Sequence, residues 1–272
     1  MTTTSTTEST TNGTVRATVL SGGHPFEAGP FDELLTSLPG VACTHVPWPD
    51  ATAVFGPGGL DTTDVLVLYD MPGLGFRRGD LPELVAPPEV VVDGWERLLA
   101  AGVPVVSLHH SIASWPSWPR FADIVGGRFH YVAASLHGTD WPDSGYRHGV
   151  SQQLTVAAAD HPVCAGLPPS FELTDETYLC PVFDGSVTPL VVSDAPKTDD
   201  EFYSATLAVT GHLYSRDGWH HPAGSRLAAW THTVGRSTVV YIQPGDGPEA
   251  YANPHYRRLL TNAIRWAATT RP

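Results

Sequence analysis

Short apolar runs alternate with amphipathic stretches through the first half of the chain. Four runs rich in β-branched residues are predicted strands: Arg16–Leu20, Val41–Val46, Asp64–Tyr69 and Val103–Leu108. Three stretches with apolar positions at helical spacing are predicted helices: Phe31–Leu38, Val90–Ala101 and Trp118–Val125. The unbroken apolar character of the run at 64–69 is typical of a parallel strand that is covered on both faces.

The second half is richer in short β-type runs and ends in a strong amphipathic helix. The predicted strands here are Leu154–Ala157, Leu190–Val192, Ala205–Val209, Leu227–Thr231 and Thr238–Ile242. Asn253–Ala268 is the predicted final helix, with an apolar stripe and Pro254 near its first turn. The order of elements predicts an α/β fold: a flavodoxin-like, doubly wound, mostly parallel sheet with β-rich elaborations in the second half.

The domain organisation follows from where apolar residues begin. Residues 1–14 form a Thr/Ser tract that lacks the apolar residues of a core, so we expect a disordered tail. Residues 15–270 contain no internal repeat and no Pro/Ser-rich linker, so we expect one elaborated domain. With 272 residues, 42% of them hydrophobic, the chain can bury a sizeable core.

Charge and cysteine usage narrow the functional classes. The formal charge is −13 and no basic cluster offsets it, which argues against nucleic-acid binding. The apolar runs are far shorter than the roughly 20 residues of a membrane span. Cys43, Cys164 and Cys180 form neither a CxxC pair nor a disulfide framework, and the N-terminus does not resemble a secretory signal. We therefore expect a cytoplasmic protein, with homo-oligomerisation left open.

The first candidate chemistry lies where predicted parallel strands end. In doubly wound sheets the site lies at the carboxyl ends of the strands. His24 follows the first strand, and His109-His110 follow the strand at 103–108, so we expect His24 and His109 to face one crevice. A plain loop histidine is the alternative. Ser111 and Ser114 lie nearby without a G-x-S-x-G frame, so a serine hydrolase is only weakly supported.

Acidic residues supply the second group of candidates. Asp175 and Glu176 lie between β-type apolar residues and are followed by Tyr178; a solvated turn is the alternative interpretation. Asp246 follows the last predicted strand and could complete a cluster with His24, His109 and Glu176.

Aromatic residues and absent motifs bear on the ligand. Trp115, like several other loop aromatics, could stack on a sugar, although core packing is an equal alternative. The sequence contains no H-E-x-x-H motif, Walker loop or G-x-G-x-x-G, so no nucleotide cofactor is expected.

Taken together in their order, several segments make the chain similar to the trehalose-utilisation (ThuA-like) family. In the first half they are the first strand, which ends at Gly22-Gly23-His24, and the segment VPVVSLHHSIAS, which is followed by a Trp-rich helix and by Gly126-Gly127-Arg128-Phe129. In the second half the first is a block that contains His161-Pro162, GLP, Phe171 and DETY. After it come Leu227-Ala228-Ala229-Trp230, then Gly235-Arg236, and finally the helix NPHYRRLLTNAIRWA. The resemblance spans about residues 15–268.

This resemblance implies a class I glutamine amidotransferase-like fold without the catalytic cysteine, because His109 stands at that strand end. Cysteine-dependent glutamine hydrolysis is therefore not expected. The resemblance also implies a role in carbohydrate metabolism, notably of trehalose, related disaccharides and their 3-keto forms. One departure stands out: relatives usually have Gly-His after the last strand, where this chain has Gly245-Asp246.

The leading hypothesis is an enzyme acting on a sugar or a (3-keto-)glycoside, as a hydrolase, lyase or isomerase. The expected catalytic residues are His109, His24 and Glu176, and the expected substrate-binding residues are His110, Asp175, Tyr178, Trp115 and Asp246. His24, His109 and Asp246 could instead hold a divalent metal, for which mixed histidine and carboxylate ligands suit Zn²⁺ or Mn²⁺. A non-catalytic carbohydrate-binding protein on the same fold is the alternative, motivated by the departure at Asp246.

Overall fold

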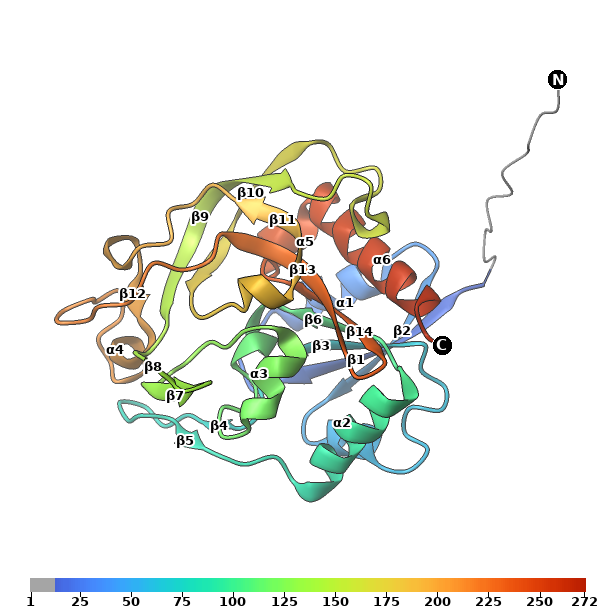
Figure 1. The fold of residues 1–272 in the computed structure, drawn as a ribbon, viewed down its shortest axis with the longest axis horizontal. Coiled ribbons are helices and arrows are strands. Elements are labelled where there is room, and N and C mark those ends of the chain that lie inside the picture. Colours follow the sequence, from blue (N-terminus) through green and yellow to red (C-terminus); the bar gives the residue numbers. More distant parts are fainter. Residues whose placement is uncertain (1–12) are drawn as a thin grey trace.

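A computed structural model describes residues 13–272. Residues 1–12 of the predicted N-terminal tail lie outside this range. One mixed sheet runs through the molecule in the order β10-β9-β11-β13-β14-β6-β3-β1-β2, with β12 paired to β9 (Figure 1). Strands β14, β6, β3, β1 and β2 are parallel, and the strands beyond β14 are antiparallel. The predicted α/β class, with parallel core strands and a β-rich second half, is confirmed.

The elements have the following bounds. The strands are β1 Val15–Gly22, β2 Val41–Pro47, β3 Val65–Asp70, β4 Leu74–Gly75, β5 Glu83–Leu84, β6 Val105–Leu108, β7 Ala134–Leu136, β8 Thr139–Trp141, β9 Gly145–Val156, β10 Ser170–Leu179, β11 Thr188–Ser193, β12 Tyr203–Ser204, β13 Leu227–Val234 and β14 Ser237–Ile242. The α-helices are α1 Ala28–Thr36, α2 Glu89–Ala101, α3 Pro119–Val125, α4 Ala205–Val209, α5 Pro248–Ala252 and α6 Pro254–Thr269.

Helices cover both faces of the parallel half of the sheet, which explains its apolar strands. In β3, Val65 and Val67 belong to the core under α1, α5 and α6, whereas Leu66 and Leu68 belong to the core under α2 and α3. Because successive strand residues point to opposite faces, both sets must be apolar. Figure 1 shows α6 and α2 on opposite sides of these strands.

One predicted strand is wrong. Ala205–Val209 forms the short helix α4, because the Ser204 side chain accepts a hydrogen bond from the backbone N–H of Leu207 and caps its first turn. A serine before a short apolar run is a helix-start signal, and it outweighs the β propensity of this segment. The strand predicted at 154–157 is the end of the much longer β9, and its partner β10 was not predicted as a strand.

The parallel arrangement brings five strand ends to one edge of the sheet. Strands β2, β1, β3, β6 and β14 end there, and Ile242 pairs with Leu108, so that Gln243 lies beside His109. The antiparallel pair β9/β10 reaches the same edge, where Asp175 accepts a hydrogen bond from the backbone N–H of Gly245 at 2.6 Å. The functional candidates of both halves of the chain therefore meet at this edge.

Within residues 13–272, none of the helices combines the length and the apolar character that crossing a membrane requires.

Candidate functional site

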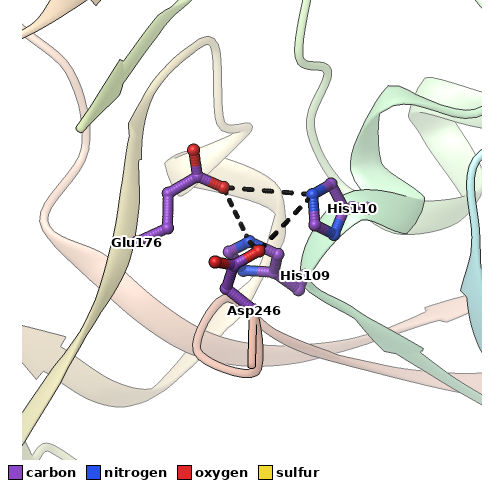
Figure 2. A group of neighbouring side chains, drawn as sticks. All are labelled: His109, His110, Glu176 and Asp246. Atoms are coloured by element: carbon purple, nitrogen blue, oxygen red, sulfur yellow. Dashed lines mark hydrogen bonds and ion pairs between the residues drawn. The ribbon is translucent and has the colours of Figure 1, made fainter. Parts of the chain in front are cut away.

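Two histidines and two carboxylates converge at the carboxyl edge of the parallel strands. They are His109 and His110 after β6, Glu176 on β10 and Asp246 after β14, and Figure 2 shows their side chains pointing toward one another. One ligand atom from each lies within 4.8 Å of the others. The His109 Nε2 atom is 2.9 Å from Glu176 Oε2 and 3.6 Å from Asp246 Oδ1. We call these four residues the His/carboxylate cluster.

His109 occupies a strained turn at the end of β6. Its φ of 40° lies in the left-handed region, which a residue with a side chain rarely adopts. The Nδ1–H group donates to the Gln243 carbonyl oxygen, which fixes the orientation of the ring. Its Nε2 faces the Glu176 carboxylate and the Tyr178 hydroxyl, the latter at 2.7 Å. A sharp turn that projects a functional side chain from a strand end is typical of catalytic sites in α/β enzymes.

Glu176 and His109 form a buried charge pair. Burial opposes the charge on His109, but the hydrogen bond and the negative charge of Glu176 raise the pKa of this imidazole to about 9. Burial alone would raise the pKa of Glu176, yet the hydrogen bond and charge of His109 lower it. The Tyr178 hydroxyl also donates to Glu176 Oε2 at 2.8 Å. In the absence of other ligands, the pair is therefore imidazolium and carboxylate near neutral pH.

Two consecutive acids are buried at the inner end of β10 because this part of the strand is covered on both faces. Neighbouring strand residues point to opposite faces. Glu176 and Tyr178 contact His109, whereas Asp175 contacts the backbone of Gly245. The register shift opposite Glu176 places the extra residue on β9. The alternative of a solvated turn is wrong, because both residues lie within strand β10.

Asp175 positions the loop that carries Asp246. Its Oδ2 accepts from the backbone N–H groups of Gly245 at 2.6 Å and Asp246 at 3.4 Å. The Tyr69 hydroxyl donates to the Asp246 carbonyl oxygen at 3.0 Å and contacts the Tyr251 hydroxyl at 2.6 Å. The position of the Asp246 backbone is thus determined from two sides, while its side chain remains partly exposed at the cluster.

His110, rather than His24, is the second histidine of the cluster. Its Nε2 is 3.7 Å from Asp246 Oδ1 and 4.0 Å from Glu176 Oε2. The His24 ring stacks on the His110 ring at a centroid distance of 4.0 Å. Both nitrogens of His24 face backbone carbonyl oxygens, those of Tyr69 at 2.9 Å and Pro25 at 3.0 Å. His24 therefore supports the ring of His110 and presents no free nitrogen to a ligand, unlike the prediction from sequence.

Two further predicted groups lie away from the cluster. Trp115 is buried in the apolar core, where its ring packs edge-on against Trp48 at 5.5 Å. Ser111 is fully buried and donates to the Leu108 carbonyl oxygen, and Ser114 is fully buried and donates to the Asp70 carbonyl oxygen. Neither hydroxyl is hydrogen-bonded to a histidine, so the serine-hydrolase alternative has no geometric support.

A cavity of about 180 Å³ opens beside the cluster, and we call it the inner cavity. Its lining combines cluster residues with aromatic side chains: His110 and Glu176, Phe129, Tyr131, Tyr146 and Tyr178. His148, which the sequence did not single out, also lines it. The side chain of His148 is 49% exposed, and its Nδ1 lies 3.4 Å from Glu176 Oε1. His148 thus places an imidazole on the open side of the cluster.

The four residues of the cluster could hold a divalent metal. Two ligand atoms on one tetrahedral Zn²⁺ lie about 3.4 Å apart, and the distances of 3.6 Å and 3.7 Å from Asp246 to the two histidines are close to this value. Burial and the neighbouring His109 lower the pKa of His110 well below its usual range, so its ring is neutral, as a metal ligand must be.

Lys197 is a further residue that sequence patterns did not reveal. It is the only lysine of the chain, and it is 4% exposed. Its Nζ donates to the Thr177 hydroxyl and to the Tyr178 carbonyl oxygen at 3.0 Å, and lies 3.4 Å from Gln243 Oε1. It therefore joins the strand that carries Glu176 to the residue whose carbonyl orients His109.

Lys197 should make stability depend on pH. Burial lowers its pKa to about 7. Between pH 7 and 10 the unfolded chain keeps a proton that the folded chain lacks, so the free energy of unfolding should rise with pH by up to about 1.4 kcal/mol per unit. Lys197→Met should remove this rise, measured by urea unfolding at several pH values. Because the chain has one lysine, selective ¹³C labelling reads its pKa directly, and titration near pH 10 would contradict the prediction.

Comparison with known proteins places these observations in a family. A sequence model of the ThuA family, described as trehalose utilisation, matches residues 42–267. No curated protein sequence matches the chain.

Solved structures share its fold. A ThuA-like protein from Parabacteroides merdae is 15% identical with a TM-score of 0.64, over 94% of this chain and 90% of that one. A ThuA-like protein from Bacteroides uniformis is 18% identical with a TM-score of 0.62, over 96% and 94%. A cytoplasmic protein from Salmonella typhimurium is 9% identical with a TM-score of 0.55, over 93% and 98%. At these identities the likeness concerns the fold alone, which is the class I glutamine amidotransferase-like α/β fold.

Proposed function

The chain belongs to the ThuA (trehalose utilisation) family, and from this premise we propose that it is a metal-dependent enzyme acting on a sugar or glycoside, in particular a 3-keto-glycoside. The observation that carries the proposal is the His/carboxylate cluster beside the aromatic inner cavity. Buried groups with perturbed pKa values that meet at a cavity are characteristic of active sites. Aromatic walls suit the apolar face of a sugar ring.

His110, Glu176 and Asp246 would hold a divalent metal together with His109, whose ring would release its Nε2 proton on binding. Zn²⁺ or Mn²⁺ is the best match to mixed nitrogen and oxygen ligands. Bound there, the metal would polarise a sugar carbonyl oxygen. The Gln243 carbonyl orients His109, and Asp175 holds the Asp246 loop. These contacts keep the ligand set in place before substrate arrives.

His148 is the residue we propose as the general base. It lies on the exposed side of Glu176 and lines the inner cavity, whereas both nitrogens of His109 are engaged inside the protein. In a 3-keto-glycoside, the C2–H bond is acidic because it adjoins the keto group. Transfer of this proton to His148 leaves an enolate. Its electron pair forms the C1–C2 double bond as the C1–O bond breaks, and the protonated His148 returns its proton to the departing oxygen, which leaves as an alcohol.

Metal content and turnover test this proposal together. We expect the purified protein to contain about one equivalent of Zn²⁺ or Mn²⁺ by elemental analysis and to release the C1 substituent from 3-keto-glycosides. Removal of the metal with a chelator should lower turnover at least about 100-fold and also lower the melting temperature, because a ligand that binds only the folded state stabilises it. Both should recover when the metal is restored.

Three outcomes would contradict the proposal in different ways. Turnover unaffected by the chelator would exclude the metal. Sugar binding without turnover and without metal would favour a non-catalytic carbohydrate-binding protein. Absence of any affinity for carbohydrates would remove the substrate class.

A further inference from the structure

We propose that a cavity on the polar face of α6 binds a phosphate group, either free or as part of a small phosphate monoester. The cavity, which we call the arginine cavity, has a volume of about 390 Å³. Arg257, Arg258 and Arg265 of α6 line it, together with residues 37–39 of the turn between α1 and β2. Its lining is distinct from the His/carboxylate cluster and from the inner cavity. The proposal therefore does not depend on the proposed function.

The three arginines lack the carboxylate partners that other arginines of the chain have. Within residues 13–272, the arginines that pair with a carboxylate are Arg16, Arg77, Arg120 and Arg147. Of the described residues that line the arginine cavity, none is acidic. The chain has 28 acidic and 15 basic residues, so a group of arginines without carboxylates departs from its charge distribution. A cavity with this lining has a positive potential, which attracts an anion.

The position of the arginines on α6 adds to this unbalanced positive charge. Helix α6 begins at Pro254, so Arg257 and Arg258 lie about one turn from its N-terminus. The helix dipole makes this end positive, and the first turn contains no acidic residue. Positive side chains at this end are repelled by the dipole and by one another. An anion held between them would offset both repulsions.

Hydrogen bonds hold Arg257 in place before a ligand arrives. Its Nε donates to the Tyr251 carbonyl oxygen, and its Nη1 donates to the Ser37 hydroxyl. Within the described part of the chain, no group accepts a hydrogen bond from its Nη2 or from the guanidinium groups of Arg258 and Arg265. One fixed arginine and two arginines with all their donors available therefore surround the cavity.

Two glycine turns place the other two guanidinium groups against the protein surface. A Cβ at Gly40 would lie 3.1 Å from Nη1 of Arg265, and a Cβ at Gly166 would lie 2.7 Å from Nη1 of Arg258. Both glycines have a φ of 71°, in the left-handed region, where glycine is the residue that fits without strain. Contact with these turns limits the freedom of the two side chains, and this lowers the entropy cost of ordering them around a ligand.

The chemistry of the lining favours a phosphate group over other anions. The planar fork of an arginine matches two phosphate oxygens, and several arginines can share one phosphate. A phosphate monoester carries about two negative charges at pH 7 and three acceptor oxygens, more than a carboxylate offers. The cavity volume is typical of small-molecule sites. The total charge of −13 disfavours a long polyanion such as a nucleic acid.

Calorimetry with two phosphate probes tests the site without requiring turnover. The protein is titrated at low ionic strength with inorganic phosphate and with glycerol 3-phosphate, and glycerol is the reference without phosphate. We expect at least one phosphate probe to bind with a Kd below about 1 mM and more weakly as salt is added. Binding of both probes would show that phosphate alone suffices, and binding of glycerol 3-phosphate alone would show that an ester is required; either result supports the site.

The double variant Arg258→Gln/Arg265→Gln should weaken this binding at least about tenfold. Arg78→Gln/Arg236→Gln is the matched control, because it removes two positive charges at exposed arginines outside the cavity. We expect the control to bind phosphate within about twofold of wild type. Since all four arginines are exposed, we expect both double variants to fold, and their melting temperatures check this.

Four results would overturn the proposal. The first is that neither probe binds up to about 10 mM. The second is an equal loss of affinity in the two double variants, which would reflect total charge. The third is loss of phosphate binding after the metal is removed with a chelator and dialysis, which would place the phosphate at the cluster. The fourth is a dimer that Arg258→Gln/Arg265→Gln dissociates, without phosphate binding, which would assign this face to a second copy of the chain.

Discussion

Replacing Glu176 with glutamine should lower turnover of a 3-keto-glycoside by about 1000-fold or more and reduce bound metal to a small fraction of one equivalent. Glutamine keeps the shape of glutamate and can still accept hydrogen bonds from Tyr178 and His109. It removes the negative charge that pairs with His109 at 2.9 Å and lies 4.0 Å from His110. The loss therefore reports on charge at the cluster, and not on packing.

Glu172→Gln is the matched control for this variant. It makes the same substitution on the same strand, β10, but at an exposed residue that contacts Ser151. We expect wild-type turnover, metal content and melting temperature for this control. Elemental analysis and initial-rate measurements on both variants provide the comparison. If Glu176→Gln keeps metal and turnover within about fivefold of the control, the cluster is not the reacting centre.

The fold was predictable where local pattern and tertiary structure agree. The parallel core was readable because strands such as Asp64–Tyr69 must be apolar on both faces. The end of α2 was readable because Gly102 follows it and adopts the left-handed conformation with φ of 71°. Strand β10 was less visible, because its outer half alternates but its inner half carries buried Asp175, Glu176 and Thr177. A strand with polar residues at buried positions resembles a loop in the sequence.

The candidate site was predictable only in outline. Strand ends directed attention to His109 and to Asp246, which the structure brings together with Glu176. Whether His24 or His110 belongs to the cluster depends on which of them faces backbone carbonyl oxygens. The sequence of side chains does not show where those carbonyl groups lie. The same holds for Gln243, which acts on His109 through its main chain. His148 lies on an alternating strand, where an exposed histidine is unremarkable.

Replacing His109 should also abolish turnover, and the choice of substitute separates chemistry from backbone strain. His109→Asn removes the imidazole but keeps a residue type that tolerates the left-handed conformation. His109→Ala should be less stable than His109→Asn by up to about 1 kcal/mol, because the φ of 40° is less favourable for alanine than for asparagine or histidine. We expect both variants to lose at least about 1000-fold in turnover, and His109→Ala to be the less stable one in urea unfolding. Equal loss of activity with unequal stability assigns the loss to the missing ring.

His137→Asn is the control that the chain offers for this comparison. His137 has a φ of 52°, and its ring pairs with Asp123 at 2.8 Å while remaining 54% exposed. The substitution thus repeats the change of side chain in the same backbone region but away from the cluster, and we expect wild-type turnover with a stability change below about 1 kcal/mol. Comparable loss of turnover in His137→Asn and His109→Asn would mean that the loss is not specific to the imidazole beside Glu176. Wild-type turnover in His109→Asn would remove His109 from the reaction altogether.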